Sequence, residues 1–182
     1  MWLYIIIAIV VVLLLLVFTT YNSFVKLNNK VEEAFSTMDV YLKKRWNLIP
    51  NIVETVKGYA NYEKKALEEV INLRNDVYDK MLTNDKIDVN NKLSQEISKL
   101  MAIAESYPEL KANESFKDLS CQLTKIEDDI ANARKYFNGT VRIFNDKVQM
   151  FPNNIIARIF GYKEKNMFEA NKNERENVKV KL

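Results

Sequence analysis

The chain begins with MWLYIIIAIVVVLLLLVF, residues Met1 to Phe18, and this stretch determines how the rest of the sequence is interpreted. It contains no charged residue, no glycine and no proline. A helix of this length measures about 27 Å, close to the ~30 Å hydrocarbon core of a bilayer. A helix on the surface of a soluble domain would carry a polar stripe, and this stretch has none. We therefore expect residues 1–20 to form a transmembrane anchor.

A cleaved signal peptide is the alternative to a permanent anchor. No Lys or Arg precedes the apolar stretch, and no small-x-small cleavage pattern follows it. The single cysteine, Cys121, lies far downstream, so lipoprotein processing is also excluded. We expect the anchor to stay attached to the chain.

Basic residues near the apolar stretch predict its orientation. Lys26 and Lys30 follow it, whereas only the terminal amine precedes it. Loops rich in Lys and Arg stay in the cytoplasm. The sequence therefore predicts a single-pass cell-membrane protein with its N-terminus outside and its C-terminal domain in the cytoplasm.

The composition excludes several classes of function. The 27 basic and 24 acidic residues give a net charge of +3, and no block of one sign stands out, so a nucleic-acid partner is not expected. Histidine is absent, which excludes Ser-His and Cys-His nucleophile pairs and zinc sites that need imidazole. We expect no cofactor and no metal. With three glycines and three prolines in 182 residues, the chain has the composition of long helices.

Apolar residues recur in steps of three and four, which is the spacing of a buried helix face. Four stretches show this spacing, namely residues 24–42, 52–77, 93–107 and 116–151. None can bury its apolar face alone, so we predict an all-α fold in which the anchor is followed by an antiparallel, coiled-coil-like bundle of about four long helices. The bundle would occupy residues 21–162, and the charged residues 163–182 would form a disordered tail.

Pro50 leaves two interpretations open for the first bundle helix. Proline removes a backbone donor and disfavours helical angles in the residue before it, so the helix should kink or end there. If it ends, Asn51 and Glu54 supply a capping box for a second helix, which would contain Gly58. The polar segment Thr83–Asp88 (TNDKID) would then end that second helix.

The fourth bundle helix has the most regular pattern. Asn113 is a suitable N-cap, and the apolar spacing crosses Asn138-Gly139 without a change of phase. Pro152 should end this helix. A short helix over residues 155–160, closed by Gly161, should then fold back onto the bundle end rather than touch the bilayer.

Several segments resemble the LemA family of bacterial membrane proteins. They are YNSFV at 21–25, VEEAF at 31–35, DVYLKKRWNLIPNIVETVK at 39–57, YPELKANESF at 107–116 and ANARKYFN at 131–138. The resemblance implies a single N-terminal span and a helical-bundle domain. It implies little about chemistry, because the family is similar to no established enzyme class.

Arg45, Lys57, Glu127 and Arg134 are the candidate functional residues. They could line a polar groove that binds a partner, or they could form a half-buried hydrogen-bond network that sets the helix register, because buried charges must be paired. No nucleophile or phosphate-binding loop accompanies them, so no catalytic residue is proposed. We predict a membrane-anchored scaffold or adaptor that binds another protein, and not an enzyme. The alternative is a membrane-tethered domain that binds a small ligand or acts as an enzyme.

Overall fold

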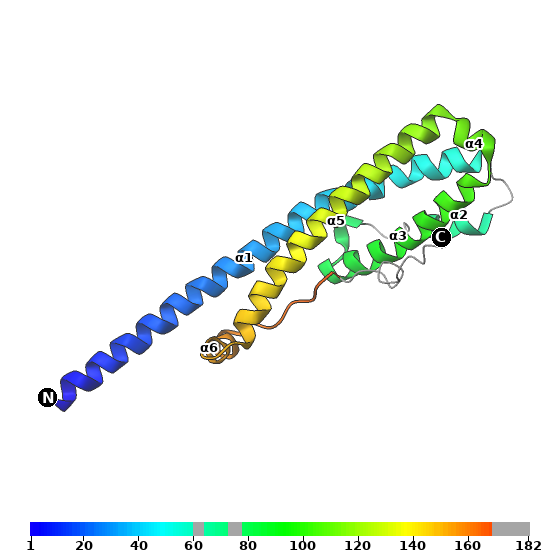
Figure 1. Ribbon diagram of the computed structural model, residues 1–182. Helices are drawn as coiled ribbons and strands as arrows, with labels where there is room; N and C mark the ends of the chain where they lie inside the picture. The colour runs from blue at the N-terminus through cyan, green and yellow to red at the C-terminus, as the bar shows by residue number, and fades with distance from the viewer. Residues whose placement is uncertain (60–63, 73–77, 169–182) are drawn as a thin grey trace, which may run out of the picture. The chain divides into compact units, whose positions relative to one another are not determined.

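The structure is a computed structural model that describes residues 1–59, 64–72 and 78–168, and the regular elements in these residues are helices (Figure 1). They are α1 (Trp2–Lys57), α2 (Lys64–Asn72), a single 3₁₀ turn (Tyr78–Lys80), α3 (Thr83–Glu105), α4 (Pro108–Ala112), α5 (Glu114–Gln149) and α6 (Asn153–Phe160). The predicted all-α class is confirmed: a long helix with an apolar N-terminal part packs against other long helices.

The chain divides into two compact units. The first unit consists of Met1–Met38 and Ala133–Met167, and the second consists of Asp39–Asn132 and Phe168–Leu182. Both α1 and α5 contribute residues to each unit.

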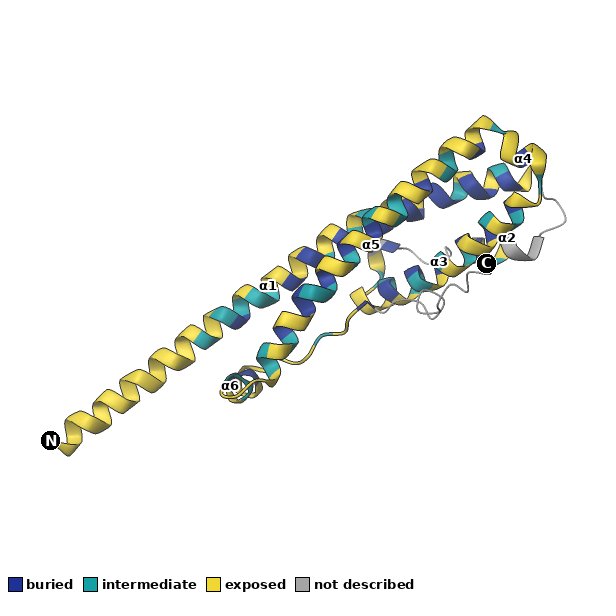
Figure 2. Ribbon diagram, in the orientation of Figure 1, coloured by how far each residue is buried: buried dark blue, intermediate teal, exposed yellow. Residues whose placement is uncertain are grey.

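The N-terminal part of α1 is exposed on every side. Residues 1–19 have no buried or half-buried side chain, which Figure 2 shows as a continuous yellow segment. Among the described residues, α1 is the one helix long and apolar enough to cross a membrane. A side-chain surface this apolar is unfavourable in water, so the segment suggests membrane anchoring.

Pro50 lies inside α1, which neither ends nor restarts there. Of the two interpretations left open for Pro50, the helix end is therefore wrong, and with it the capping box at Asn51 and Glu54. Asn51 instead contributes to the helix interior, where its carbonyl oxygen accepts a hydrogen bond from Thr55 Oγ1 at 2.7 Å. Buried residues on both sides of the proline explain the continuity, because their shared face is lost if the helix ends: Leu48, Ile49, Ile52, Val53 and Val56.

The predicted second helix, residues 52–77, is not a single element. Its first residues belong to α1, which ends at Lys57 before Gly58, and a separate helix, α2, follows. The segment Thr83–Asp88 is also not a turn, since it forms the start of α3. Turn-forming residues are common in the first turn of a helix, Asp85 suits the positive end of the helix dipole, and Ile87 is buried. Residues 73–77 lie outside the described residues.

The predicted fourth helix is confirmed as α5, which continues through Asn138-Gly139. Its start has the expected cap, because the backbone N–H of Phe116 donates to Asn113 Oδ1 at 3.0 Å. Its buried residues include a series spaced by seven positions: Phe116, Leu123, Ile130, Phe137 and Phe144. This heptad spacing is the coiled-coil-like pattern expected for the bundle.

The first unit has an aromatic core. The Phe24 ring lies 4.9 Å from the Tyr162 ring and 6.2 Å from the Phe144 ring, centroid to centroid. The Phe35 ring lies 5.8 Å from the Phe137 ring. These contacts pair early residues of α1 with late residues of α5, so in this unit the two helices are antiparallel.

The short helix after Pro152 is also present, as α6, and Gly161 closes it with a φ of 76°. Ile156 and Ala157 are buried, so α6 folds back onto the first unit as expected. Beyond it, the two hydrogen bonds between the Asn145 amide and the Lys165 backbone, at 2.8 and 2.9 Å, hold the first residues of the predicted tail. Residues 169–182, the rest of that tail, lie outside the described residues.

Candidate functional site

The second unit contains a buried arginine. Arg45 belongs to the central part of α1, where the apolar residues Leu42 and Ile49 are also buried. Its own side chain has no exposed surface. A buried cation is costly unless acceptors surround it, so the residues around Arg45 define the site.

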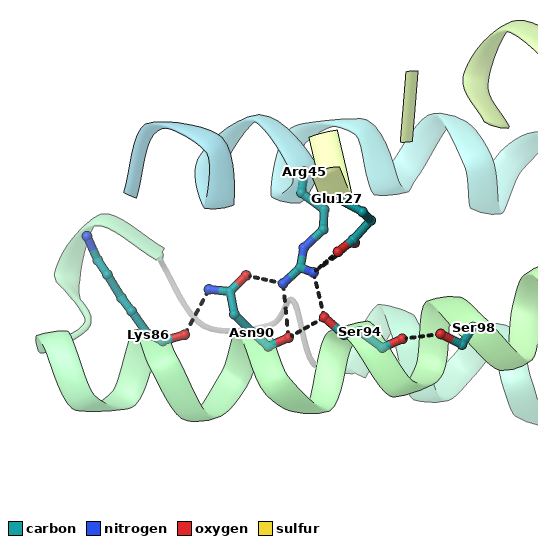
Figure 3. A network of polar contacts seen from close by, with 6 residues as sticks. All are labelled: Arg45, Lys86, Asn90, Ser94, Ser98 and Glu127. Atoms are coloured by element: carbon teal, nitrogen blue, oxygen red, sulfur yellow. Dashed lines mark hydrogen bonds and ion pairs between the residues drawn. The ribbon is translucent and has the colours of Figure 1, made fainter. Parts of the chain in front are cut away.

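Side chains from α3 and α5 accept hydrogen bonds from Arg45 (Figure 3). Its Nη1 donates to Ser94 Oγ at 2.6 Å and to the Glu127 carboxylate at 2.8 and 3.1 Å. Its Nη2 donates to the Asn90 carbonyl at 2.9 Å and to Asn90 Oδ1 at 2.7 Å. We call Arg45, Asn90, Ser94 and Glu127 the Arg45 cluster. It joins α1, α3 and α5 through a single guanidinium group.

The Arg45 cluster is not equally buried on all sides. Glu127 keeps 35% of its side chain exposed, whereas Asn90 is fully buried. The planar guanidinium presents its donors in a fixed geometry, so shifting α3 along α1 would break the bonds to Asn90 and Ser94. The arrangement therefore sets the register of these helices.

A second polar group adjoins the Arg45 cluster. Asp39 accepts a hydrogen bond from the Tyr78 hydroxyl at 2.6 Å. It also forms an ion pair with Lys86, at 2.7 Å. Asn90 connects the two groups, because its Nδ2 donates to the Lys86 carbonyl at 2.8 Å. The pKa of Tyr78 is raised above its usual value, first by burial and then by the hydrogen bond to the Asp39 carboxylate and its charge.

The predicted site residues do not all meet. Arg45 and Glu127 form an ion pair, whereas Lys57 is exposed at the end of α1. Arg134 is half-buried and belongs to the first unit. Arg45 has no surface with which to contact a partner directly, so its geometry fits the register interpretation. Partner binding by Lys57, Glu127 and Arg134 stays a prediction.

Sequence reasoning missed Asn90, Ser94 and Tyr78. A signal for the first two was present, because Asn90 and Ser94 share the helical spacing of the buried residues Ile87 and Ile97. Polar side chains in phase with a buried face are satisfied by hydrogen bonds in folded proteins. Tyr78 lies outside the long helices, in the 3₁₀ turn, where the spacing of apolar residues does not predict which side chains are buried.

A cleft of about 390 Å³ lies elsewhere in the second unit. Its lining includes Ala104 and Phe116, which are buried, and the exposed residues Lys111, Lys117 and Cys121. Among the described residues, no group of three or more His, Cys, Asp or Glu side chains is placed to hold a metal ion. The Arg45 cluster, by contrast, consists of hydrogen bonds and an ion pair among the chain's own residues.

Comparison with known proteins identifies the family. The sequence profile of the LemA family matches residues 34–182. The chain belongs to the LemA family. This confirms the resemblance and covers the Arg45 cluster, α3 and all of α5.

Individual relatives are similar over most of this LemA-family chain. Protein LemA of Metamycoplasma hominis is 24% identical over 163 residues, which cover 86% of this chain and 72% of that protein. Magnetosome protein MamQ of Magnetospirillum gryphiswaldense is 23% identical over 174 residues, which cover 81% of this chain and 64% of that protein. Magnetosome protein MamQ 1 of Paramagnetospirillum magneticum is 21% identical, again over 64% of its length.

Proposed function

We propose that this LemA-family protein is a membrane-anchored scaffold, without catalytic activity, whose helical domain binds another protein. The Arg45 cluster supports this proposal, because its buried cation is paired with Glu127 and holds α1, α3 and α5 in register. Such a network makes the second unit rigid. A rigid, non-catalytic domain suits a scaffold.

The observation that carries the proposal is an apolar stripe on the outer face of α5, in the first unit. Tyr136 and Ile143 are 47% and 52% exposed and stand seven positions apart, the spacing of one coiled-coil face. Gly139 lies between them, and a Cβ atom built there would meet nothing within 4 Å. The stripe therefore consists of two apolar side chains on either side of a glycine. An amphipathic helix of a partner protein can pack against such a surface.

Photo-crosslinking tests this surface in the full chain in its own membranes. A photoreactive amino acid at Ile143 should give a defined adduct with one protein. The same amino acid at Arg142, which is exposed and lies about 100° around α5 from Ile143, should not. Equal adducts from both positions would indicate non-specific collision and contradict the proposal.

Gly139→Leu provides a matched variant. The open space over Gly139 admits the new side chain, and leucine favours the helix more than glycine does, so stability should not fall. The bulk would nevertheless block a helix that packs between Tyr136 and Ile143. The adduct from Ile143 should therefore disappear in this variant, and its persistence would show that the partner does not pack over Gly139.

The proposal includes a cytoplasmic location for the helical domain, which Lys26 and Lys30 support through the positive-inside rule. Protease added to intact spheroplasts should leave the domain uncut, and lysis should make it cleavable. Digestion from outside would reverse the orientation and place the partner on the other side of the membrane.

The alternative function, a membrane-tethered domain that binds a small ligand or acts as an enzyme, is favoured by the cleft beside Phe116, whose lining includes the ionisable residues Glu105, Lys111 and Lys117. A ligand there would protect the exposed Cys121 from alkylation. Purified full chain should be alkylated at the same rate with and without a small-molecule extract of the cell. Specific protection would favour the alternative.

A further inference from the structure

One face of α6 is buried and the other is exposed. Ile156 and Ala157 are buried against the first unit. Ile155 and Ile159, four positions apart and therefore on one side of the helix, are 51% and 70% exposed. Phe151, just before α6, is 80% exposed. Folding thus leaves an apolar face on α6 that no described residue covers.

Contacts with α1 place the C-terminal end of α6 beside the membrane anchor. The ring of Phe160 lies 4.7 Å from that of Tyr21, centroid to centroid. Phe160 also lines a groove with Leu14, Val17 and Phe18, which belong to the apolar stretch of α1. All of these residues are in the first unit, so the contact is internal to it.

The depth of α6 follows from these contacts. The groove reaches from Tyr21 back to Val11, a distance of about 15 Å along a helix. If α1 spans the bilayer as far as Phe18, the Phe160 ring, which contacts Tyr21, lies at the edge of the hydrocarbon. Phe160 therefore brings the exposed face of α6 to the level at which lipid acyl chains begin.

The charges around α6 suit a lipid surface. Between Met150 and Lys165 the basic residues are Arg158, Lys163 and Lys165, against the single acid Glu164. Arg158 and Lys163 are exposed. Basic residues next to an apolar helix face are typical of helices that lie in a membrane interface and attract anionic headgroups.

We propose that α6 is an interfacial helix that inserts Phe151, Ile155 and Ile159 into the bilayer that α1 enters. The inference rests on the membrane anchoring included in the proposed function. It adds a second membrane contact to the transmembrane helix and fixes the first unit against the lipid surface. The occupant of the exposed face is thus lipid, and not a partner protein. α6 then folds back onto the first unit and also contacts the bilayer, whereas the sequence favoured the first of these over the second.

Fluorescence quenching by lipid tests this insertion in the full chain. Cys121→Ser removes the native thiol, and Ile159→Cys then carries an environment-sensitive label. The protein is placed in vesicles of phosphatidylcholine and phosphatidylglycerol that contain lipids with a nitroxide near the headgroup. The emission should shift to the blue, and the quencher should remove more than half of its intensity. A label at Phe151 should behave likewise.

Two further label positions serve as controls. Val17→Cys reports the anchor and should be quenched. Lys135→Cys is exposed on α5, about 21 Å before its end, and should not be quenched. Quenching at Val17 and Ile159 but not at Lys135 is the expected pattern.

Other outcomes would overturn the inference in distinguishable ways. Quenching at Val17 without quenching at Ile159 or Phe151 would leave the anchor in place and show that α6 stays in water. Absence of quenching at Val17 would refute the anchoring, and the inference with it. A blue shift at Ile159 without quenching, together with a disulfide between two unlabelled Ile159→Cys chains, would show that a second copy covers this face.

Discussion

Arg45 of α1 and Glu127 of α5 are 82 positions apart in the sequence and form an ion pair at 2.8 Å that is asymmetric in its access to water. Arg45 has no exposed side-chain surface, whereas Glu127 keeps 35% of its side chain exposed. An unpaired Glu127 could therefore be hydrated, but an unpaired Arg45 could not. The two partners are not equally dispensable.

Replacing either partner should reveal this asymmetry. Glu127→Met leaves a buried cation without its counter-ion, which should lower the free energy of unfolding by about 3–5 kcal/mol. Arg45→Met leaves the buried Asn90 Oδ1 without its donor, at a cost of about 1–3 kcal/mol, but water reaches the remaining carboxylate and no charge stays buried, so its loss should be the smaller one. The exposed neighbour Lys125→Met should change stability by no more than about 0.5 kcal/mol. Denaturant unfolding of the full chain in detergent micelles measures all three, and a larger loss for Arg45→Met would contradict the asymmetry.

The buried stripe of α5 should dominate the stability of the bundle. Leu123 and Ile130 are 4% and 1% exposed, so Leu123→Ala or Ile130→Ala should each cost about 2–5 kcal/mol through lost burial and a residual cavity. Asp128→Ala, at an exposed position, should stay within about 0.5 kcal/mol. Denaturant unfolding followed by circular dichroism measures the free energy of unfolding of each variant. Equal effects at buried and exposed positions would mean that the stripe is not a core.

Tyr78 should make the protein less stable in alkali. Its pKa is raised in the folded state, so above about pH 10 the unfolded chain releases this proton while the folded chain keeps it. The unfolded state then binds fewer protons, and the free energy of unfolding falls as the pH rises. Tyr78→Phe should remove this contribution and give a shallower decline above pH 10 in the same unfolding assay. Parallel declines for the two proteins would show that Tyr78 does not contribute.

Asn145 should protect the segment that follows α6. Its amide makes two hydrogen bonds with the Lys165 backbone, and Asn145→Ala removes both. At about 1 kcal/mol each, their loss should speed tryptic cleavage at Lys163 and Lys165 by roughly tenfold or more. Asp146→Ala, an exposed neighbour, is the control. If both variants were cleaved at the wild-type rate, the two bonds would not hold the segment.

The apolar stretch of α1 should behave as an integral anchor. The full chain should stay with membranes during carbonate extraction, because transfer of the stretch to water exposes its whole apolar surface. A chain that starts at Tyr21 should be recovered in the soluble fraction with its helicity retained. Release of the full chain by carbonate would argue against a transmembrane helix.

The sequence by itself determined the features that depend on neighbours along the chain. The apolar stretch at 1–18, the periodicity of α5, its cap at Asn113 and the left-handed position at Gly161 are all local. A helix face, a cap and a backbone angle each involve residues within a few positions of one another. Their physical causes can therefore be read from the order of residues alone.

The tertiary structure alone decided what depends on segments far apart. At Pro50 the local preference for a helix end was outweighed by apolar side chains that stay buried on both sides of it. Likewise, the polar residues around Asp85 form the start of α3 and not a turn, because a helix there allows Ile87 to be buried. The choice of Glu127, Asn90 and Ser94 as acceptors for Arg45 also came from packing, since a buried guanidinium takes whichever acceptors the folded helices bring within reach.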